Sequence, residues 1–366
     1  MRICCVIPNL ESGGAERVLS LLANEWATRG HVVSVVTFGP ATGDAYQLDP
    51  RVKRVGMNLE MRTTNLVKAI SNNLRKVRML RRVFTVNAPH VVISFMDKAN
   101  ILSLFAQVGL RLRLIISERT HPSYQPVGGV WAVLRRLTYR RADALIVQSE
   151  GVRVWARGLI APQRVHVIPN AVGTQFSAPV DAGRPRGSVI LAVGRLSREK
   201  GFDILIEAFA KLAITHPRWS LMIVGDGPCY ARLQRLASEL LPPSSFLFTG
   251  KVQQPEQYYR TAEIFVLSSR YEGFPNALLE AMACGCAVIA ADAPGGTKAI
   301  VRDGIDGVLV PVNDPYALTT AMVRLMNDED LRSRLRARAV EVSSRFGMER
   351  VAQLWDQVIA ATSPRF

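Results

Sequence analysis

The strongest constraint on the fold is a repeated alternation of short, β-branched runs with segments long enough to be helices. In the first half of the chain the runs are RICCVIP from Arg2, HVVSVVTF from His31, HVVISF from His90, RLIIS from Arg113 and DALIVQS from Asp143. The pattern starts again with SVILAVG from Ser188, WSLMIVGDG from Trp219, FLFTG from Phe246, EIFVLSS from Glu263 and CAVIAAD from Cys286. Strands that are apolar on both faces are typical of parallel sheets covered by helices on both sides. The pattern therefore predicts an α/β protein with two doubly wound domains.

The length of 366 residues also favours two domains over one. The join is predicted within residues 168–187, which contain several Pro and Gly and have no sustained hydrophobic period. We therefore expect domains over residues 1–172 and 173–345, followed by a helix over 346–366 that returns toward the first domain. Since ligands of open parallel sheets bind beyond the carboxyl ends of the strands, two such domains facing each other would form a cleft.

The cysteines and the hydropathy pattern favour a cytosolic protein. The chain has five cysteines and neither a CxxC pair nor a disulfide framework, which suits a reducing compartment. No positively charged leader precedes the first apolar run, and no stretch of eighteen uninterrupted apolar residues occurs. We therefore expect neither an export signal nor a membrane-spanning segment.

The positive charge is concentrated in the first half of the chain. Residues 1–172 hold 24 Lys and Arg against 10 Asp and Glu, whereas residues 173–366 hold 22 against 20. A basic half can meet nucleic acid, an anionic membrane surface or a polyanionic substrate, and charge alone does not choose among them. Nucleic acid is disfavoured because only 7% of the residues are aromatic and no basic and aromatic module is present.

Three stretches that contain candidate binding or catalytic residues follow predicted strands. In ESGGAERVLSLLANEW, Gly13 and Gly14 allow a tight turn before a helix whose free N–H groups can meet an anion. In GRLSREKG, Arg195 and Lys200 flank a turn and supply a forked guanidinium and an ammonium suited to a diphosphate. Ordinary strand-to-helix connections and solvated loop charges are the structural alternatives.

The third stretch, RYEGFPNALLEAMACGC, places two glutamates eight residues apart. Pro275 predicts a helix start and Gly285 predicts its end. Glu280 then lies inside a mostly apolar helix, where a carboxylate is costly unless something donates hydrogen bonds to it. The pair Glu272 and Glu280 therefore requires a polar partner, either a ligand or another side chain.

Taken in order, these stretches resemble a known enzyme family. SGGAERV, VGRLSREKG, VGDGP, SSRYEGFPNALLEAMACG and GGTKAIVRDGIDGVLV are similar to the motifs of nucleotide-sugar-dependent glycosyltransferases of family 4. The resemblance covers nearly the whole chain and implies the GT-B fold, with two Rossmann-like domains facing a cleft. The segments VISFMDKANI and LIISERT are similar to those of transferases that extend polyprenyl-diphosphate-linked oligosaccharides with N-acetylhexosamines.

The resemblance implies a role for each matching residue. Arg195 and Lys200 would bind the donor diphosphate, and Gly14 would bring its amide to it. Glu280 would accept hydrogen bonds from the ribose hydroxyls, and Glu272 would address the transferred sugar. The loop expected to contact sugar and phosphates comprises Gly273, Phe274, Pro275 and Asn276.

The chemistry implied by the family needs neither a metal nor another cofactor. Fixed cations and helix N-termini can stabilise the charge that develops on the leaving diphosphate. Asp328-Glu329-Asp330 fits the Asp-x-Asp of metal-dependent transferases formally, but the three residues precede a charged helix and are better interpreted as its first turn. The family retains the anomeric configuration, and we expect the acceptor to attack on the face that the phosphate leaves, with Glu272 not acting as a nucleophile.

The family's histidine position is ambiguous in this chain. Relatives place a histidine after the strand that RLIIS matches, and here the stretch is SERTHPSY. Either Arg119 or His121 stands at that place, depending on the alignment. His121 precedes Pro122 and is expected in an extended loop. Glu118 and Arg119 are candidates for the acceptor site.

The segment NLVKAISNNLRKVRMLRRVF is the best indication of the acceptor. At roughly 100° per residue, one helical face collects the apolar residues Leu66, Ile70, Val77, Leu80 and Phe84. The opposite face collects the basic residues Lys68, Arg75 and Arg82, which are seven residues apart, and Arg78 lies nearby. This basic stripe would meet phosphates, either of an anionic membrane leaflet or of a lipid-diphosphate acceptor. A core-packed helix with a solvated basic back is the structural alternative.

The sequence thus predicts a retaining glycosyltransferase at the cytoplasmic face of the inner membrane. It would move a hexose or an N-acetylhexosamine, N-acetylgalactosamine being one candidate, from a UDP-sugar to a lipid-linked oligosaccharide or polysaccharide. A nucleotide-sugar epimerase of related architecture and a non-catalytic sugar-nucleotide-binding subunit are the alternatives.

Overall fold

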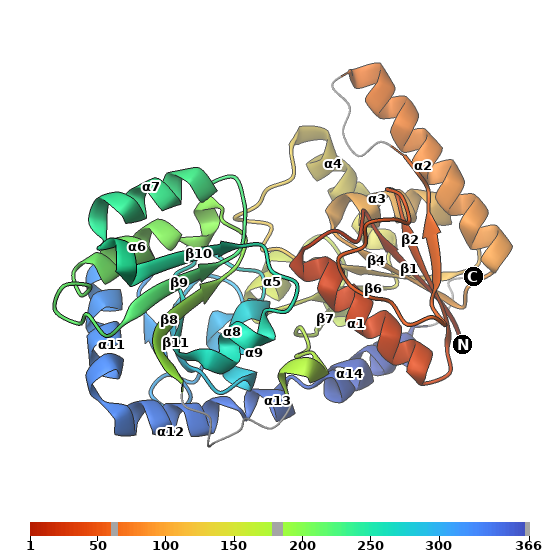
Figure 1. The fold of residues 1–366 in the computed structure, drawn as a ribbon. Coiled ribbons are helices and arrows are strands. Elements are labelled where there is room, and N and C mark those ends of the chain that lie inside the picture. Colours follow the sequence, from red (N-terminus) through yellow and green to blue (C-terminus); the bar gives the residue numbers. More distant parts are fainter. Residues whose placement is uncertain (60–64, 178–185, 363–366) are drawn as a thin grey trace. The chain divides into compact units, whose positions relative to one another are not determined.

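The structure is a computed structural model that describes residues 1–59, 65–177 and 186–362. These residues form two compact units (Figure 1). Unit 1 contains Met1–Ala171 together with the described C-terminal residues from Met348, and unit 2 contains Val172–Gly347. Within the predicted join, residues 178–185 lie outside the described residues.

Unit 1 is built on a parallel sheet with the strand order β3-β2-β1-β4-β5-β6-β7. Its strands are Arg2–Ile7 (β1), Val32–Thr37 (β2), Lys53–Gly56 (β3), Val91–Phe95 (β4), Arg113–Ser117 (β5), Ala144–Val147 (β6) and Val165–Val167 (β7). Its helices are Gly14–Thr28 (α1), Leu66–Asn87 (α2), Asp97–Gln107 (α3), Gly129–Thr138 (α4), Glu150–Trp155 (α5) and Met348–Ala361 (α14), with short 3-10 turns at Tyr139–Arg141 (η1) and Pro162–Arg164 (η2). The strand order reverses between β1 and β4, as in doubly wound folds.

The period of two along each strand explains why this sheet is covered on both faces. Alternate strand residues such as Ile3 and Ile93 form one core with α1 and α14. The residues between them, such as Cys4 and Val92, form another core with α2 and α3. In the first core, Trp355 of α14 stacks on Phe95 with ring centroids 5.8 Å apart.

Unit 2 repeats this plan with the strand order β10-β9-β8-β11-β12-β13, again all parallel. Its strands are Gly187–Val193 (β8), Ser220–Val224 (β9), Phe246–Gly250 (β10), Ala262–Leu267 (β11), Ala287–Ala291 (β12) and Val308–Val310 (β13). Its helices are Phe202–Ala210 (α6), Tyr230–Leu240 (α7), Glu256–Thr261 (α8), Asn276–Ala283 (α9), Thr297–Ile300 (α10), Pro315–Asn327 (α11), Glu329–Ala339 (α12) and Val342–Arg345 (α13), with 3-10 turns at Thr174–Phe176 (η3), Arg198–Lys200 (η4) and Pro243–Ser245 (η5). Helices α6, α7, α11 and α12 cover one face, and α8, α9 and α13 cover the other.

The predicted fold class is confirmed, and each of the ten predicted strands is present. Three strands were not predicted, namely β3, β7 and β13. All three are edge strands of three or four residues, and a run that short has no readable period. Asp328-Glu329-Asp330 lies at the start of α12, as predicted. Asp328 caps the helix by accepting from the amide of Leu331 at 2.8 Å, and Glu329 and Asp330 lie in the first turn.

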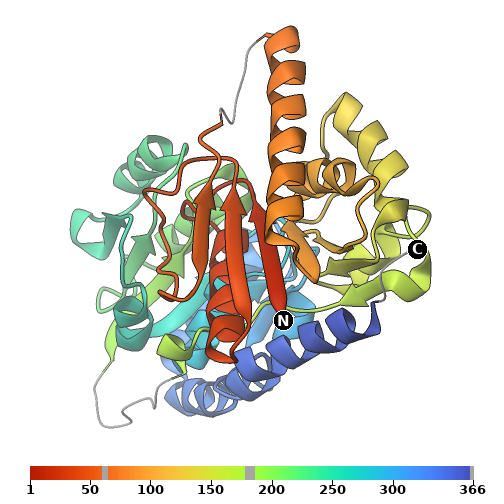
Figure 2. The ribbon, with the colours of Figure 1, turned by 90° about the vertical axis from the view of Figure 1, so that its right-hand side faces the viewer.

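Helix α2 packs along only part of its length. Asn65 caps it by accepting from the amide of Val67 at 2.9 Å, and the core contacts come from its second half, where Leu80 and Phe84 are buried. Ile70, which was predicted on the packed face, is 54% exposed, while the side chain of Leu66 lies outside the described part. Figure 2 shows the N-terminal end of α2, in orange, extending beyond the sheet of unit 1. None of the described helices has the length and apolar character needed to cross a membrane.

Candidate active site

The cationic turn predicted after the first strand of unit 2 lies at the carboxyl end of β8. Lys200 ends η4, and Gly201 follows with a φ of +64°. A Cβ at residue 201 would lie 2.1 Å from the carbonyl oxygen of Ser268, so only glycine allows the turn to approach the end of β11. Ser268 Oγ donates to the carbonyl oxygen of Lys200 at 3.0 Å and fixes this approach. Arg195 is exposed, and within the described ranges its guanidinium forms no hydrogen bond or ion pair, although its carbonyl oxygen accepts from Ser197.

Lys200 forms an ion pair with Glu272. Its Nζ is 2.8 Å from both carboxylate oxygens, and Ser269 Oγ donates to Oε1 at 2.6 Å. Glu272 is only 7% exposed, so the ammonium and the hydroxyl supply the partners that a buried carboxylate needs. The sequence predicted that both residues contact the sugar-nucleotide donor, but it did not predict that they bind each other.

The loop after Glu272 is supported by two glycines at the end of β12. The amide of Glu272 donates to the carbonyl oxygen of Pro294 at 3.0 Å. A Cβ at Gly295 would lie 2.0 Å from the carbonyl oxygen of Glu272, and a Cβ at Gly296 would lie 2.3 Å from the Phe274 ring. Any larger residue would displace the loop that holds the predicted donor-binding residues Gly273, Phe274, Pro275 and Asn276.

The helix predicted from Pro275 is present as α9, which starts at Asn276 and stops before Gly285, whose φ is +71°. Glu280 lies on α9 and is 5% exposed. The Tyr259 hydroxyl donates to its Oε2 at 3.0 Å. Tyr259 was missed, although a tyrosine in a helix packed on the sheet was a signal, because a buried tyrosine hydroxyl usually finds a partner.

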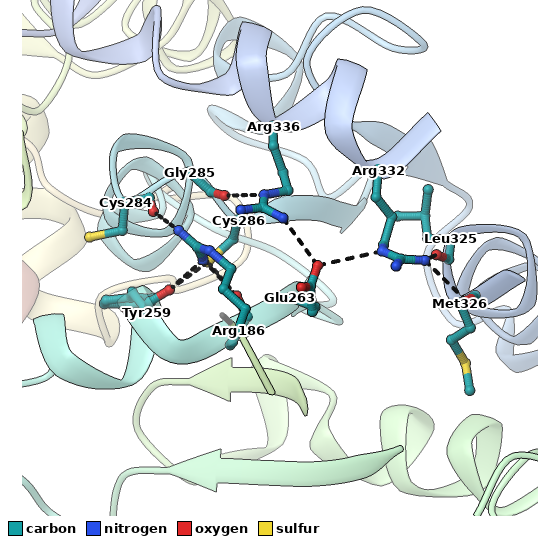
Figure 3. A network of polar contacts seen from close by, with 11 residues as sticks. Arg186, Tyr259, Glu263, Cys284, Gly285, Cys286, Leu325, Met326, Arg332 and Arg336 are labelled. Carbon is teal, nitrogen blue, oxygen red and sulfur yellow. Dashed lines mark hydrogen bonds and ion pairs between the residues drawn. The ribbon is translucent and has the colours of Figure 1, made fainter. Parts of the chain in front are cut away.

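Arg186 holds together α8 and α9, the helices that carry Tyr259 and Glu280, and Figure 3 shows its contacts with Tyr259 and Cys284. Its Nη1 donates to the carbonyl oxygens of Tyr259 at 3.0 Å and of Ala262 at 2.6 Å, and its Nη2 donates to that of Cys284. These carbonyls lie at the C-terminal ends of α8 and α9, where the helix dipole is negative. One guanidinium therefore fixes the position of α8 relative to α9.

In unit 1, the predicted anion-binding turn opens α1. Gly14 is the first helical residue and is exposed, with Gly13 as the N-cap. The carboxylate of Glu16 folds back over Gly13, since a Cβ at Gly13 would lie 2.1 Å from Glu16 Oε2. Burial raises the pKa of Glu16. The N-terminus of α1 thus already has a carboxylate of the chain beside it.

The residues after β5 have different surroundings. Glu118 is buried, accepts a hydrogen bond from the Tyr139 hydroxyl and lies 3.6 Å from Arg135 Nη1. Burial raises the pKa of Glu118 to about 7. Arg119 is also buried, whereas His121 is half-buried and packs edge-on against Tyr124 at 4.9 Å. The carboxylate of Glu118, predicted as an acceptor contact, is thus engaged within unit 1.

The predicted basic stripe on α2 faces solvent. Lys68, Arg75, Arg78 and Arg82 are exposed. No ion pair to any of the four is found in the described part of the chain. Their charges are therefore available to an anionic partner.

Unit 2 gathers complementary groups at one sheet edge. An ammonium, an exposed guanidinium and two buried carboxylates follow the neighbouring strands β8 and β11. Together they can bind a ligand that carries both anionic oxygens and hydroxyl donors.

Two family models cover most of the chain. Residues 13–171 match the glycosyl transferase 4-like domain, and residues 181–342 match glycosyl transferases group 1. The chain is 30% identical over 361 residues to a Campylobacter jejuni enzyme, GalNAc-alpha-(1->4)-GalNAc-alpha-(1->3)-diNAcBac-PP-undecaprenol alpha-1,4-N-acetyl-D-galactosaminyltransferase, with 98% of each chain covered. The chain belongs to the GT-B glycosyltransferases.

Two further comparisons agree with this assignment. A second Campylobacter jejuni enzyme, N-acetylgalactosamine-N,N'-diacetylbacillosaminyl-diphospho-undecaprenol 4-alpha-N-acetylgalactosaminyltransferase, is 28% identical, with 71% of this chain and 73% of the relative covered. The fold matches that of sucrose-phosphate synthase from Thermosynechococcus elongatus with a TM-score of 0.83, at 22% identity and with 98% and 99% of the two chains covered. The glycosyltransferase is thus an enzyme, and neither the epimerase nor the non-catalytic subunit gains support.

Proposed function

We propose that this glycosyltransferase moves a hexose or N-acetylhexosamine, N-acetylgalactosamine being the first candidate, from a UDP-sugar to a lipid-linked or polysaccharide acceptor. The observation that carries the donor site is the contact of Lys200 with Glu272, together with the buried Glu280 on the helix that follows the same strand. The relatives that act on undecaprenol-linked sugars support the choice of acceptor.

In the proposed donor complex, Lys200 and Arg195 face the diphosphate and Glu280 accepts from the ribose hydroxyls. A phosphate oxygen competes with Glu272 for the Lys200 ammonium, because both are anionic acceptors for the same donor. The Glu272 carboxylate can then accept hydrogen bonds from hydroxyls of the sugar. Donor binding would therefore turn an internal ion pair into two contacts with the substrate.

The transfer step is proposed to retain the anomeric configuration. The bond between the anomeric carbon and the phosphate oxygen breaks, the acceptor hydroxyl forms the new bond on the same face, and its proton passes to the departing phosphate. Lys200 and Arg195 stabilise the charge on that phosphate, which removes the need for a metal ion. We do not assign Glu272 the role of nucleophile, because in this complex its carboxylate accepts from hydroxyls of the sugar and from Ser269 Oγ, which already donates to Oε1 at 2.6 Å.

We further propose that unit 1 meets the anionic cytoplasmic face of the inner membrane. The half of α2 that lacks core contacts exposes Val67, Ile70 and Leu74, three residues on one helical face, beside its basic residues. Helix α4 exposes a similar row formed by Val130, Val133 and Leu137. The N-terminal end of α2 and helix α4 lie toward the same end of unit 1 in both views (Figures 1 and 2). Neither α2 nor the segment 129–141 contains an acidic residue, so both suit anionic lipid headgroups.

The test is transfer by the purified protein from a panel of UDP-, GDP- and dTDP-linked sugars to a polyprenyl-diphosphate-linked oligosaccharide and to a soluble glycan. We expect a UDP-linked hexose or N-acetylhexosamine to be used, the product to keep the donor's anomeric configuration by NMR, and activity to survive excess EDTA. Transfer from another nucleotide only, an inverted product, or loss in EDTA that manganese or magnesium restores would each contradict the corresponding part of the proposal.

A further inference from the structure

The guanidinium of Arg119 is buried in unit 1, and no described residue pairs it with a counter-charge. Arg119 follows β5 and is only 7% exposed. Its Nη1 donates to Asn170 Oδ1 at 3.3 Å, whereas Nε and Nη2 have no hydrogen-bond partner among the described residues. Burial lowers the pKa of Arg119 to about 9. Because an uncompensated buried charge is costly, the group calls for an explanation.

The neighbours of Arg119 do not neutralise it. The guanidinium lies 4.3 Å from the centroid of the Phe95 ring and 6.0 Å from that of Trp355, and these contacts stabilise a cation without pairing it. The adjacent carboxylate of Glu118 is engaged with Tyr139 and Arg135. The guanidinium is held against aromatic rings, while Nε and Nη2 along one of its edges have no partner among the described residues. This arrangement is more typical of a group that binds a ligand than of one that only stabilises the fold.

Further polar atoms without partners lie at the same edge of the sheet. Ser149 Oγ is buried and unbonded, and so is His121 Nδ1, within the part of the chain that the structure describes. Both side chains adjoin Gly151, since a Cβ there would lie 3.6 Å from His121 Nε2 and 3.9 Å from Ser149 Oγ. Arg119 and Ser149 follow the paired strands β5 and β6, and such carboxyl ends are where doubly wound sheets bind ligands.

A second contact positions the amide that holds Arg119. Gln148 Nε2 donates to Asn170 Oδ1 at 2.6 Å, so one amide oxygen accepts from both Gln148 and Arg119. This shared acceptor ties the loop after β6 to the loop after β5. The orientation of the guanidinium is therefore set from two sides, by the rings and by Asn170.

We propose that Arg119 forms a phosphate-binding site in unit 1 with Ser149, which follows the neighbouring strand, and with His121, which adjoins Gly151 as Ser149 does. Nε–H and Nη2–H lie along one edge of the guanidinium and can donate in parallel to two oxygens of one phosphate. Ser149 Oγ can donate to the same group. The proposal deepens the proposed function, because the phosphate would belong either to the donor diphosphate or to the diphosphate of a lipid-linked acceptor.

Pyrophosphate is the probe, and the rise in melting temperature that it causes is the readout. Arg119→Met removes the fork while keeping an apolar side chain on Phe95, and Arg119→Lys keeps the charge without the fork. Arg111→Met, at an exposed arginine of the same unit, is the matched control. Lys200→Met removes the cation proposed to bind phosphate in unit 2, and it therefore distinguishes pyrophosphate binding in unit 2 from binding at Arg119. We expect Arg119→Met to weaken pyrophosphate binding about tenfold to a hundredfold, Arg119→Lys to weaken it less, and Arg111→Met to leave it unchanged.

The melting temperature without pyrophosphate gives a readout that separates binding from structure. Because the unpaired cation is costly, Arg119→Met should melt at or above the wild-type temperature. Pyrophosphate binding by Arg119→Met and Arg119→Lys that equals wild type would overturn the proposal. A second combination of results would also overturn it. In that case both Arg119 variants melt at a much lower temperature than wild type, and the double variant Lys200→Met/Arg119→Lys binds pyrophosphate as well as Lys200→Met does.

Steady-state kinetics identify the source of the phosphate. A raised KM for the sugar nucleotide alone assigns it to the donor, and a raised KM for the lipid-linked substrate alone assigns it to the acceptor. Pyrophosphate binding requires neither substrate, so the site can be supported even where transfer to a lipid-linked acceptor fails. The failure of the proposed function and the failure of this site are therefore distinguishable.

Discussion

At the residue scale, the contact between Lys200 and Glu272 changes what a substitution at Lys200 should do. Lys200 is both the proposed ligand of the diphosphate and the partner of a buried carboxylate. We predict that Lys200→Met lowers transfer by about a hundredfold or more, because a cation that stabilises the leaving group is lost. It should also lower the free energy of unfolding by about 1–3 kcal/mol, because Glu272 keeps a charge without its strongest partner.

The double variant Lys200→Met/Glu272→Gln separates the two effects. Removing the stranded charge should restore most of the stability while activity stays low, since the leaving group still lacks its cation. Urea denaturation and initial-rate assays measure the two quantities. Transfer by Lys200→Met within a few-fold of wild type would reject the assignment of Lys200 to the diphosphate.

At the element scale, the position of Glu280 depends on how α8 packs against α9. Arg186 binds the C-terminal carbonyls of both helices, and Tyr259 reaches from α8 to Glu280. We predict that Tyr259→Phe weakens UDP binding about threefold to thirtyfold, because the carboxylate loses one of the donors that orient it. The loss should be much smaller for 2′-deoxy-UDP, which offers Glu280 fewer ribose hydroxyls. Calorimetric titration with both nucleotides checks this.

The adjacent Tyr258 provides the matched control for that experiment. It is partly buried on the same helix, and Tyr258→Phe removes an identical hydroxyl. We expect this control to bind both nucleotides as wild type does. Equal losses for UDP and 2′-deoxy-UDP in Tyr259→Phe would mean that Tyr259 acts on the fold of unit 2 and has no special relation to the ribose contact.

At the scale of the whole molecule, part of the positive charge of the first half of the chain is exposed on the surface of α2. We predict that replacing Lys68, Arg75 and Arg82 with Gln lowers the affinity for anionic vesicles by about 1 kcal/mol per charge near the surface. Transfer to a lipid-linked acceptor should fall with it. Donor binding should not change, and the helix should persist because Gln is nearly as good a helix former as Lys or Arg. Vesicle flotation at two salt concentrations is the measurement, since screening should weaken wild type more steeply.

A variant with the same change in charge controls for net charge alone. Lys211, Arg235 and Lys251 are exposed on unit 2, and replacing them with Gln removes three charges far along the sequence from α2. This control should float as wild type does. Identical flotation and identical transfer by the α2 variant and wild type would leave the basic stripe as a solvated helix back.

Local patterns in the sequence determined the elements of this protein. Apolar runs with β-branched residues predicted ten parallel strands, and Pro275 and Gly285 predicted the ends of α9, because these signals act over a few residues. The spacing of Glu272 and Glu280 and the motif order predicted the family and the candidate donor residues. Each of these features is a property of neighbours in the chain.

Only the tertiary structure decided how those residues are partnered. Lys200 meets Glu272 because β8 and β11 are neighbours in the sheet, and Glu280 meets Tyr259 because α8 packs beside α9. The burial of Arg119 and the unpacked half of α2 likewise depend on which elements lie nearby. Strand order and helix packing bring together residues that are far apart in the chain. The hydrophobic period of a short segment carries no information about these contacts or their free energy.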